Sequence, residues 1–222
     1  MRQRSIFDIV GPVMIGPSSS HTAGAVRLGN LARAIFGDQP SGARVLLHGS
    51  FASTGRGHGT DLAIVAGLLG FSPDDPRIRE ALSYAERAGM TVEFGLAELG
   101  DVHPNTAVLE LEGRGGRTMR VVGSSLGGGD VVVTDIDGFD VEATGELPML
   151  VVEHEDRPGE IAAVSSILAE SGVNIAAMRV SREVRGGTAL MLIETDATVD
   201  DATVERICAA PAIHSVRSVP AV

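Results

Sequence analysis

Apolar residues recur with a helical period in three segments of the first half of the chain. The first stripe follows a serine-rich run, is spaced i, i+3, i+4, i+7, i+8 and ends at Gly37; it comprises Leu28, Leu31, Ala32, Ile35 and Phe36. A second helix is expected from about Thr60 to Leu69. A third is expected to begin at Asp75-Pro76, because Asp caps helices well and Pro is favoured at the first helical position.

Short apolar runs predict strands up to residue 144. One strand is expected at 45–47, and five more at 91–94, 107–111, 118–122, 131–135 and 139–142. Asp137-Gly138 is a tight-turn pair, so the last two strands should form a hairpin. The glycine-rich stretch 123–129 is expected to be a flexible connection that can approach a ligand closely. It is not a phosphate-binding loop, because Lys-Ser or Lys-Thr does not follow its glycines.

A second pattern begins after a composition change at residues 143–148. Strand, helix, strand, strand, helix and strand are expected over residues 149–153, 159–171, 174–181, 188–194, 202–209 and 213–219. This order is that of a ferredoxin-like domain. We therefore predict an α+β protein with a mixed α/β domain over residues 1–145 and a βαββαβ domain over residues 146–222.

The composition excludes several functional classes. The formal net charge is −11 and no cluster of Lys and Arg offsets it, so nucleic acid is a poor partner. Apolar runs stay below the ~20 residues needed to cross a bilayer, and the sequence does not open on a signal-type stretch. A soluble, cytoplasmic protein with no membrane partner is expected. The single Cys208 fits a reducing compartment and cannot by itself hold an iron–sulfur cluster.

Three polar segments interrupt this apolar sequence. They are Pro17–Thr22 (Pro-Ser-Ser-Ser-His-Thr), Thr54–Asp61 (Thr-Gly-Arg-Gly-His-Gly-Thr-Asp) and His103–Thr106 (His-Pro-Asn-Thr). The first two precede expected helices, and the N–H groups at helix starts attract anions. Together the three segments predict a pocket for a small carboxylate.

The run Arg4–Gly24 resembles the opening of the β subunit of bacterial iron–sulfur-dependent L-serine dehydratase. The Gly-His-Gly-Thr-Asp element at 57–61, the His-Pro-Asn-Thr element at 103–106 and the glycines at 127–129 resemble elements of the same family. That β subunit likewise ends in an ACT domain, which is similar here in Asp156-Arg157-Pro158-Gly159 and in Ser171–Ile175. The resemblance therefore covers essentially the whole chain.

The resemblance implies an activity, a cofactor and a partner. In this family L-serine loses water to give aminoacrylate, which becomes pyruvate and ammonia, and an open iron of a 4Fe-4S cluster acts as Lewis acid on the substrate hydroxyl. Such a cluster needs about three or four thiolate ligands, and this chain has one Cys. The cluster is therefore expected on a separate α subunit, and the isolated chain should be inactive.

Removing the Cα proton beside an ionised carboxylate calls for a base and for groups that screen the carboxylate. His58 is the candidate base; Thr60 is expected to orient substrate or imidazole, and Asp61 to hold a tautomer or cap the helix. The candidates for binding the substrate carboxylate are Ser18, Ser19, Ser20 and Thr22. The alternative for both segments is ordinary helix capping.

The remaining polar residues allow more than one interpretation. His21 either binds substrate or orders the serine loop. His103, Asn105 and Thr106 are candidates for fixing the ammonium or carboxylate of the substrate, and a turn before the next strand is the alternative. A mononuclear metal site from His21, His58 and His103 is disfavoured, because their spacing does not support one. A serine nucleophile is disfavoured as well, because the Gly-x-Ser-x-Gly elbow does not occur.

In the ACT-like half, Gly159 and Asn174 are the candidate effector-binding residues. Gly159 lets the strand-to-helix turn approach another backbone, and Asn174 can cap a turn or bond an effector. Such domains usually pair edge to edge, so dimerisation is a second explanation of the same pattern. The sequence leaves both explanations open.

A binding module without catalysis is the alternative function. The first domain also resembles the allosteric substrate-binding domain of some 3-phosphoglycerate dehydrogenases, which pairs with an ACT domain to sense metabolites. Those modules are attached to a nucleotide-binding enzyme, and a Gly-x-Gly-x-x-Gly fingerprint after a strand does not occur here. A sensor needs ligand contacts but no base, so the role of His58 separates the two functions.

Overall fold

The computed structural model describes residues 13–222, except for the side chain of Arg56. Residues 4–12, the first part of the run that resembles serine dehydratases, lie outside the described residues. The chain divides into two compact units, residues 1–137 and 138–222. The domain boundary at residue 145 stays a prediction. No helix among the described residues is long and apolar enough to cross a membrane.

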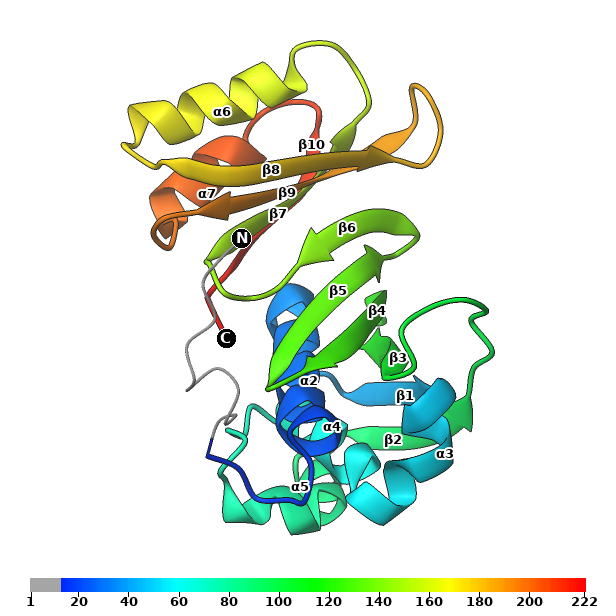
Figure 1. Cartoon of the computed structure of the whole chain (residues 1–222). Coiled ribbons are helices and arrows are strands. Elements are labelled where there is room, and N and C mark those ends of the chain that lie inside the picture. Colours follow the sequence, from blue (N-terminus) through cyan, green and yellow to red (C-terminus); the bar gives the residue numbers. More distant parts are fainter. Residues whose placement is uncertain (1–12) are drawn as a thin grey trace. The chain divides into compact units, whose positions relative to one another are not determined.

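The predicted helices of the first unit are present (Figure 1). A π-helical turn, η1 (Ser19–Ala23), continues directly into α2 (Gly24–Phe36), whose predicted apolar stripe is fully buried. The helix ends at Gly37, which adopts the left-handed conformation with φ 86°. The helix α4 (Thr60–Leu68) also has its predicted bounds within one residue.

The third predicted helix is divided into two parts. It begins as a 3-10 turn, η2 (Pro76–Glu80), and continues as α5 (Ala81–Arg87). The side chain of Asp75 accepts a hydrogen bond from the backbone N–H of Arg77, so the predicted cap is confirmed.

A fourth helix, α3 (Gly49–His58), was not predicted. Its sequence holds three glycines and no apolar stripe, so local propensity does not favour a helix. Tertiary contacts fix it instead. The ring of Phe51 is fully buried, and the backbone N–H of Ser50 donates to the carbonyl of Pro104 over 2.7 Å.

The sheet of the first unit contains β1 (Gly42–Leu47), β2 (Thr91–Leu96), β3 (Thr106–Glu112), β4 (Thr118–Gly127) and β5 (Asp130–Ile136), in the order β2-β1-β3-β4-β5. The pair β1–β2 is parallel, and β1–β3, β3–β4 and β4–β5 are antiparallel. The expectation of a flexible connection from residue 123 is wrong as far as Gly127, because Gly123, Ser124 and Ser125 pair with β5.

The strand register defines two ends of this sheet. Leu96, Leu47, Ala107 and Gly123 lie in one row across four strands. We call this row the Leu96 end. Thr91, Gly42, Glu112 and Thr118 lie in a row at the opposite end, the Thr91 end.

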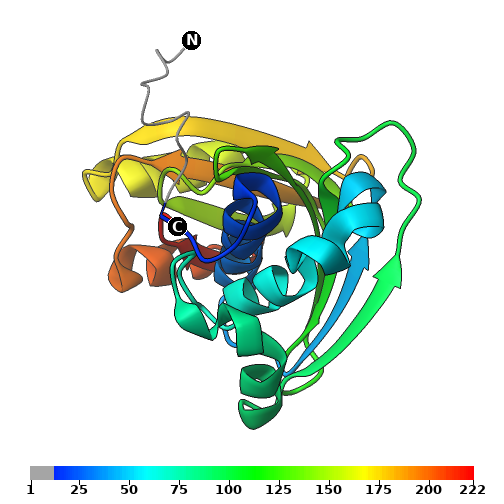
Figure 2. The same cartoon turned by 60° about the horizontal axis from the view of Figure 1, so that its bottom comes forward.

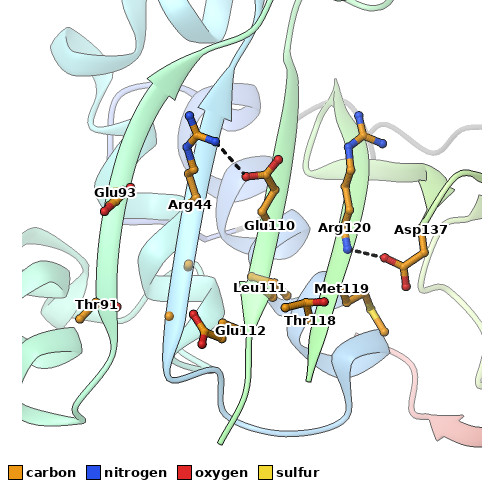
Figure 3. Close-up of a pocket in the computed structure, with 12 residues that line it drawn as sticks. Arg44, Thr91, Glu93, Glu110, Leu111, Glu112, Thr118, Met119, Arg120 and Asp137 are labelled. Atoms are coloured by element: carbon orange, nitrogen blue, oxygen red, sulfur yellow. Dashed lines mark hydrogen bonds and ion pairs between the residues drawn. The ribbon is translucent and has the colours of Figure 1, made fainter. Parts of the chain in front are cut away.

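One face of the sheet is covered by helices and the other carries charges. The helices gather on one face (Figure 2), where α2 packs on β4 and β5. On the opposite face Arg44 of β1 forms an ion pair with Glu110 of β3 over 3.3 Å, and the backbone N–H of Arg120 donates to Asp137 (Figure 3). Because the ion pair of Arg44 and Glu110 is exposed, it contributes only about 0–1 kcal/mol to stability.

The helices α2 and α4 cross at two glycines. A Cβ added to Gly29 would overlap the carbonyl oxygen of Ile64, and one added to Gly67 would overlap the carbonyl oxygen of Val26. The two backbones are therefore in direct contact. This crossing fixes the start of α4 relative to the serine-rich turn that precedes α2.

The second unit begins with β6 (Phe139–Ala143), after a turn in which Asp137 and Gly138 both have positive φ, as predicted for this pair. Then follow β7 (Met149–Glu155), α6 (Glu160–Glu170), β8 (Ile175–Arg182), β9 (Thr188–Thr195), α7 (Asp201–Cys208) and β10 (Ile213–Val219). The sheet order β10-β7-β9-β8 is antiparallel throughout and confirms the ferredoxin-like plan. Both helices bury apolar residues against this sheet, among them Val164, Leu168 and Ile207.

Candidate active site

Hydrogen bonds join the three polar segments at the Leu96 end of the sheet. The ring of His21, from the first segment, bonds through Nε2 to Thr54 Oγ1 of the second over 3.0 Å. The carbonyl of Pro104, in the third segment, accepts from the N–H of Ser50 at the start of α3. The segments therefore lie around α3, although about 80 residues separate the first from the last.

The serine run forms a hydrogen-bonded cap. Ser18 Oγ accepts from the backbone N–H of His21 over 3.2 Å, so the capping alternative describes this serine correctly. Ser20 Oγ lies 3.1 Å from Nδ1 of His21 and 3.3 Å from Ser18 Oγ. Ser19 is half-buried at the first position of η1. Thr22 is buried, and its hydroxyl has no hydrogen-bond partner among residues 13–222.

The imidazole of His21 is buried and bonded at both nitrogens. The hydroxyl of Thr54 donates to the carbonyl of Ser50 over 2.8 Å, so its oxygen is free to accept from Nε2–H of His21. In that tautomer Nδ1 accepts from the serine hydroxyls. Burial lowers the pKa of His21, the neighbouring His58 lowers it further, and a hydrogen bond to the Ser50 carbonyl opposes both effects. The lowered pKa favours the neutral ring, and the hydrogen bonds of His21 link the serine loop to α3.

His58 ends α3 and is only half-buried. Its Nδ1 lies 3.0 Å from the carbonyl oxygen of Thr54. A carbonyl can only accept, so Nδ1 must carry the hydrogen, and in the neutral ring Nε2 bears the lone pair. The ring centroid lies 5.0 Å from that of His21. The fold thus holds an imidazole in the tautomer that a general base requires, beside the serine loop.

The helix α4 begins at Thr60, after Gly59 in the left-handed conformation with φ 69°. Thr60 is fully buried, and its hydroxyl has no partner in the described part of the chain. Asp61 Oδ1 accepts from the backbone N–H of Leu62 over 2.9 Å. That carboxylate therefore bonds within the first turn of the helix. The N-cap of α4 is Gly59, which has no side chain to cap with, so capping by Thr60 and Asp61 is not confirmed.

The His-Pro-Asn-Thr segment is a turn attached to β4. His103 Nδ1 accepts from the N–H of Asn105 over 3.2 Å, and the carbonyl of Asn105 accepts from the N–H of Ser125 over 3.0 Å. Thr106 is buried, with its hydroxyl 2.7 Å from Ser124 Oγ. These hydrogen bonds, within the turn and to β4, occupy many of the polar groups of the segment, as the turn alternative predicted.

Surface hollows lie near the sheet of the first unit, and two of them differ in their relation to the predicted site. One of about 520 Å³, on the charged face, is lined by residues such as Arg44, Glu93 and Arg120 and by none of the predicted site residues (Figure 3). A second of about 440 Å³ is lined by Leu47, Ala52, Ser53, Asp61, Phe94, Gly95 and Leu96. Only the second adjoins a predicted site residue, Asp61.

The described side chains do not provide a metal centre. Within residues 13–222 no three or more of His, Cys, Asp and Glu are grouped so that they could hold a metal ion. Cys208, the single cysteine of the sequence, is exposed at the end of α7 in the second unit. One thiolate is too few for an iron–sulfur cluster, so this chain does not offer a ligand set for one.

Known proteins with similar sequences decide the family. Residues 5–101 match the family model for the serine dehydratase beta chain, and residues 149–212 match the ACT domain. A probable L-serine dehydratase beta chain of Bacillus subtilis is 44% identical over 219 residues, which are 99% of both chains. The chain belongs to the serine dehydratase β-chain family. The L-serine dehydratase beta chain of Peptoniphilus asaccharolyticus is 39% identical over 88% of this chain and 89% of its own length.

The alternative of a sensing module finds weaker support among the relatives of this β chain. A D-3-phosphoglycerate dehydrogenase of Synechocystis is 28% identical over 88% of this chain, but the match covers only 35% of that enzyme. The full-length matches are to serine dehydratase β chains. The family resemblance expected from the three motifs is thus confirmed.

Sequence reasoning missed two serines of the β-chain site. Ser50 Oγ lies 3.2 Å from Nε2 of His21. Ser125 is fully buried, its hydroxyl has no hydrogen-bond partner among the residues that the structure describes, and a Cβ added to Gly24 would overlap that oxygen. The sequence signals for both were indirect, because Ser50 lies at the start of the unpredicted helix α3 and Ser125 lies in a stretch expected to be a flexible connection.

The two candidate effector residues have clear local roles. Gly159 precedes α6 with φ 104°, a conformation that favours glycine. Asn174 Nδ2 donates to Asp196 Oδ2 over 2.8 Å, just before β8 begins. Effector binding by either residue stays a prediction.

Proposed function

We propose that this β chain supplies the base and the carboxylate-binding groups of an L-serine ammonia-lyase, which converts L-serine to pyruvate and ammonia. The observation that carries the proposal is the orientation of His58. Its Nδ1 is held by the Thr54 carbonyl, which leaves the Nε2 lone pair for a substrate proton. The names of the full-length relatives support serine as the substrate.

In this proposal Nε2 of His58 accepts the Cα proton of serine. The electron pair of the broken C–H bond forms the Cα–Cβ double bond as the Cβ–O bond breaks. The departing hydroxide takes up one proton and leaves as water, and the protonated His58 gives up the proton it accepted, so the step is balanced and His58 returns to its neutral form. The product, aminoacrylate, tautomerises to an imine, which water hydrolyses to pyruvate and ammonia. Thr60, the first residue of the next helix, is the candidate to orient substrate or the imidazole.

Hydroxyl groups near His58 are suited to bind the substrate. His21 acts as a positioning residue, because its two nitrogens order the hydroxyls of Ser18 and Ser20 on one side and Thr54 on the other. A buried hydroxyl without a partner costs about 1–3 kcal/mol. Three buried hydroxyls have no partner within residues 13–222 and are therefore candidates for hydrogen bonding to substrate; they belong to Thr22, Thr60 and Ser125. Ser19, Asp61, His103, Asn105 and Thr106 complete the proposed set.

The 4Fe-4S cluster is proposed to belong to a separate α subunit, because this chain has one cysteine. When bound by that subunit, the cluster supplies Lewis-acid assistance to the leaving hydroxyl. The ACT domain is proposed to pair with a second copy along its edge strand β8 and to bind an effector near Gly159 and Asn174. A cytoplasmic location is proposed, because a single cysteine fits a reducing compartment.

Anaerobic co-expression with the α subunit tests the proposed function. We expect serine-dependent formation of pyruvate and ammonia in equal amounts, measured by lactate dehydrogenase coupling and by an ammonia assay. D-Serine and L-threonine, each supplied separately at the same concentration, serve as substrate controls. A pair with a fully loaded cluster that forms no pyruvate from L-serine would contradict the proposal.

A further inference from the structure

Exposed apolar side chains gather at the Leu96 end of the first unit. Leu96 is 76% exposed and Phe94 40%, and Val102 and Leu126 are exposed as well. We call these four side chains the apolar rim. Isolated apolar side chains on a surface are ordinary, but several around one site indicate an interaction surface.

The register places the rim around the candidate site. Leu96 pairs with Leu47, which directly precedes the turn into α3. Val102 directly precedes His103, and Leu126 directly follows Ser125. In the described part of this unit the other exposed large apolar residues are Val13, before the serine loop, and Leu82, on α5.

The 440 Å³ hollow adjoins the rim and reaches Asp61, at the start of α4. Phe94 and Leu96 form one wall of it, and Ala52 and Ser53 of α3 and Asp61 of α4 form the other. The residues of α3 that face the serine loop, Ser50, Thr54 and His58, are spaced i, i+4, i+8 and so lie on a different flank of the helix. The hollow and the site are therefore on two sides of one helix.

The fold explains why these apolar groups are uncovered. Phe94 and Leu96 pair with Val45 and Leu47, whose side chains are buried beneath the helices. Because β2 is the edge strand, and α5 contacts it near Thr91, the side chains of Phe94 and Leu96 at the other end stay exposed. Among the described strands β2 has a neighbour on one side only, and such sheet edges are commonly covered by another chain.

We propose that the apolar rim and the adjoining hollow are the docking surface for the subunit that carries the iron–sulfur cluster. This inference rests on the proposed function, in which the partner brings its cluster to substrate at His58. A stable interface buries about 800 Å² on each partner, far more than the site itself, so it must include the surfaces next to His58 and Asp61. A second copy of this chain is a poorer occupant, because it would bring only another single cysteine.

Matched aspartate substitutions test the docking surface. The control is Leu82→Asp, because Leu82 is 41% exposed, close to the value for Phe94, and lines a hollow of about 420 Å³ with Met90 and Thr91 at the opposite end of β2. Without serine, we expect Phe94→Asp and Leu96→Asp each to raise the dissociation constant for the cluster-loaded α subunit at least about tenfold, the loss typical of an apolar anchor. Leu82→Asp should change it by less than about twofold, as a surface substitution outside an interface does.

The outcomes separate docking from catalysis. Circular dichroism first confirms that each variant is folded, and Leu126→Asp replaces a variant that is not. Unchanged binding by the rim variants would overturn the docking surface even if the wild-type pair forms pyruvate. Rim-dependent binding without pyruvate would contradict only the proposed function. Loss of self-association, with normal binding to the α subunit, would assign the rim to a second copy and overturn the inference.

Discussion

Replacing His58 by Gln is expected to reduce serine turnover by the assembled enzyme by about 10²–10⁴-fold, the usual contribution of a general base. The amide can keep a hydrogen bond to the Thr54 carbonyl, which His58 Nδ1 makes over 3.0 Å, but it cannot accept the Cα proton. Steady-state pyruvate formation at saturating partner concentration measures the effect. Binding to the α subunit should be unchanged, because the substitution removes no apolar contact.

His214→Gln is the matched control for this experiment. His214 lies on β10 in the second unit, with a half-exposed side chain 3.9 Å from Glu153. It should retain full turnover. A His58→Gln enzyme with more than a tenth of wild-type turnover would show that another group takes the proton.

Gly29→Ala is expected to destabilise the first unit by about 3 kcal/mol, because overpacking a tight contact commonly costs about 1–3 kcal/mol and more when backbone must move. The added methyl would overlap the Ile64 carbonyl at the crossing of α2 and α4. Tyr84, on α5 and the single tyrosine of the sequence, reports unfolding of this unit by its fluorescence in urea. Turnover should also fall, because the crossing sets the position of Thr60 relative to the serine loop.

Gly57→Ala provides the control for the stability measurement. A Cβ at Gly57 meets no atom within 4 Å, and the residue is helical. This substitution should raise the free energy of unfolding by up to about 1 kcal/mol, because alanine loses less conformational freedom in a helix. Equal stability of Gly29→Ala and wild type would contradict the close crossing.

The periodic parts of the fold could be predicted from the sequence. The stripe on α2, the caps of the helices and the alternating βαββαβ pattern each carry a local signal, and each element was found. The helix α3 could not be predicted, because its residues are small or polar and its order comes from Phe51 and from the Pro104 carbonyl. The extension of β4 through Ser125 depends likewise on pairing with β5.

The candidate site could be predicted as a set of segments but not as a geometry. The residue types and their motifs indicated that Ser18, His21 and His58 belong together. The sequence could not show that His21 has both ring nitrogens occupied while His58 keeps one available. Nor could it show the buried hydroxyl of Ser125, because that depends on contact with Gly24, about 100 residues away.

Mixing separately purified subunits tests most directly whether the catalytic site is shared. The α subunit, loaded with iron and sulfide, and this chain are assayed alone and then combined over a range of ratios, with pyruvate as the readout. We predict no turnover by either alone and a saturable rise on mixing, with iron found only in the α subunit. Full activity of the loaded α subunit alone, or iron bound by this chain, would contradict the account.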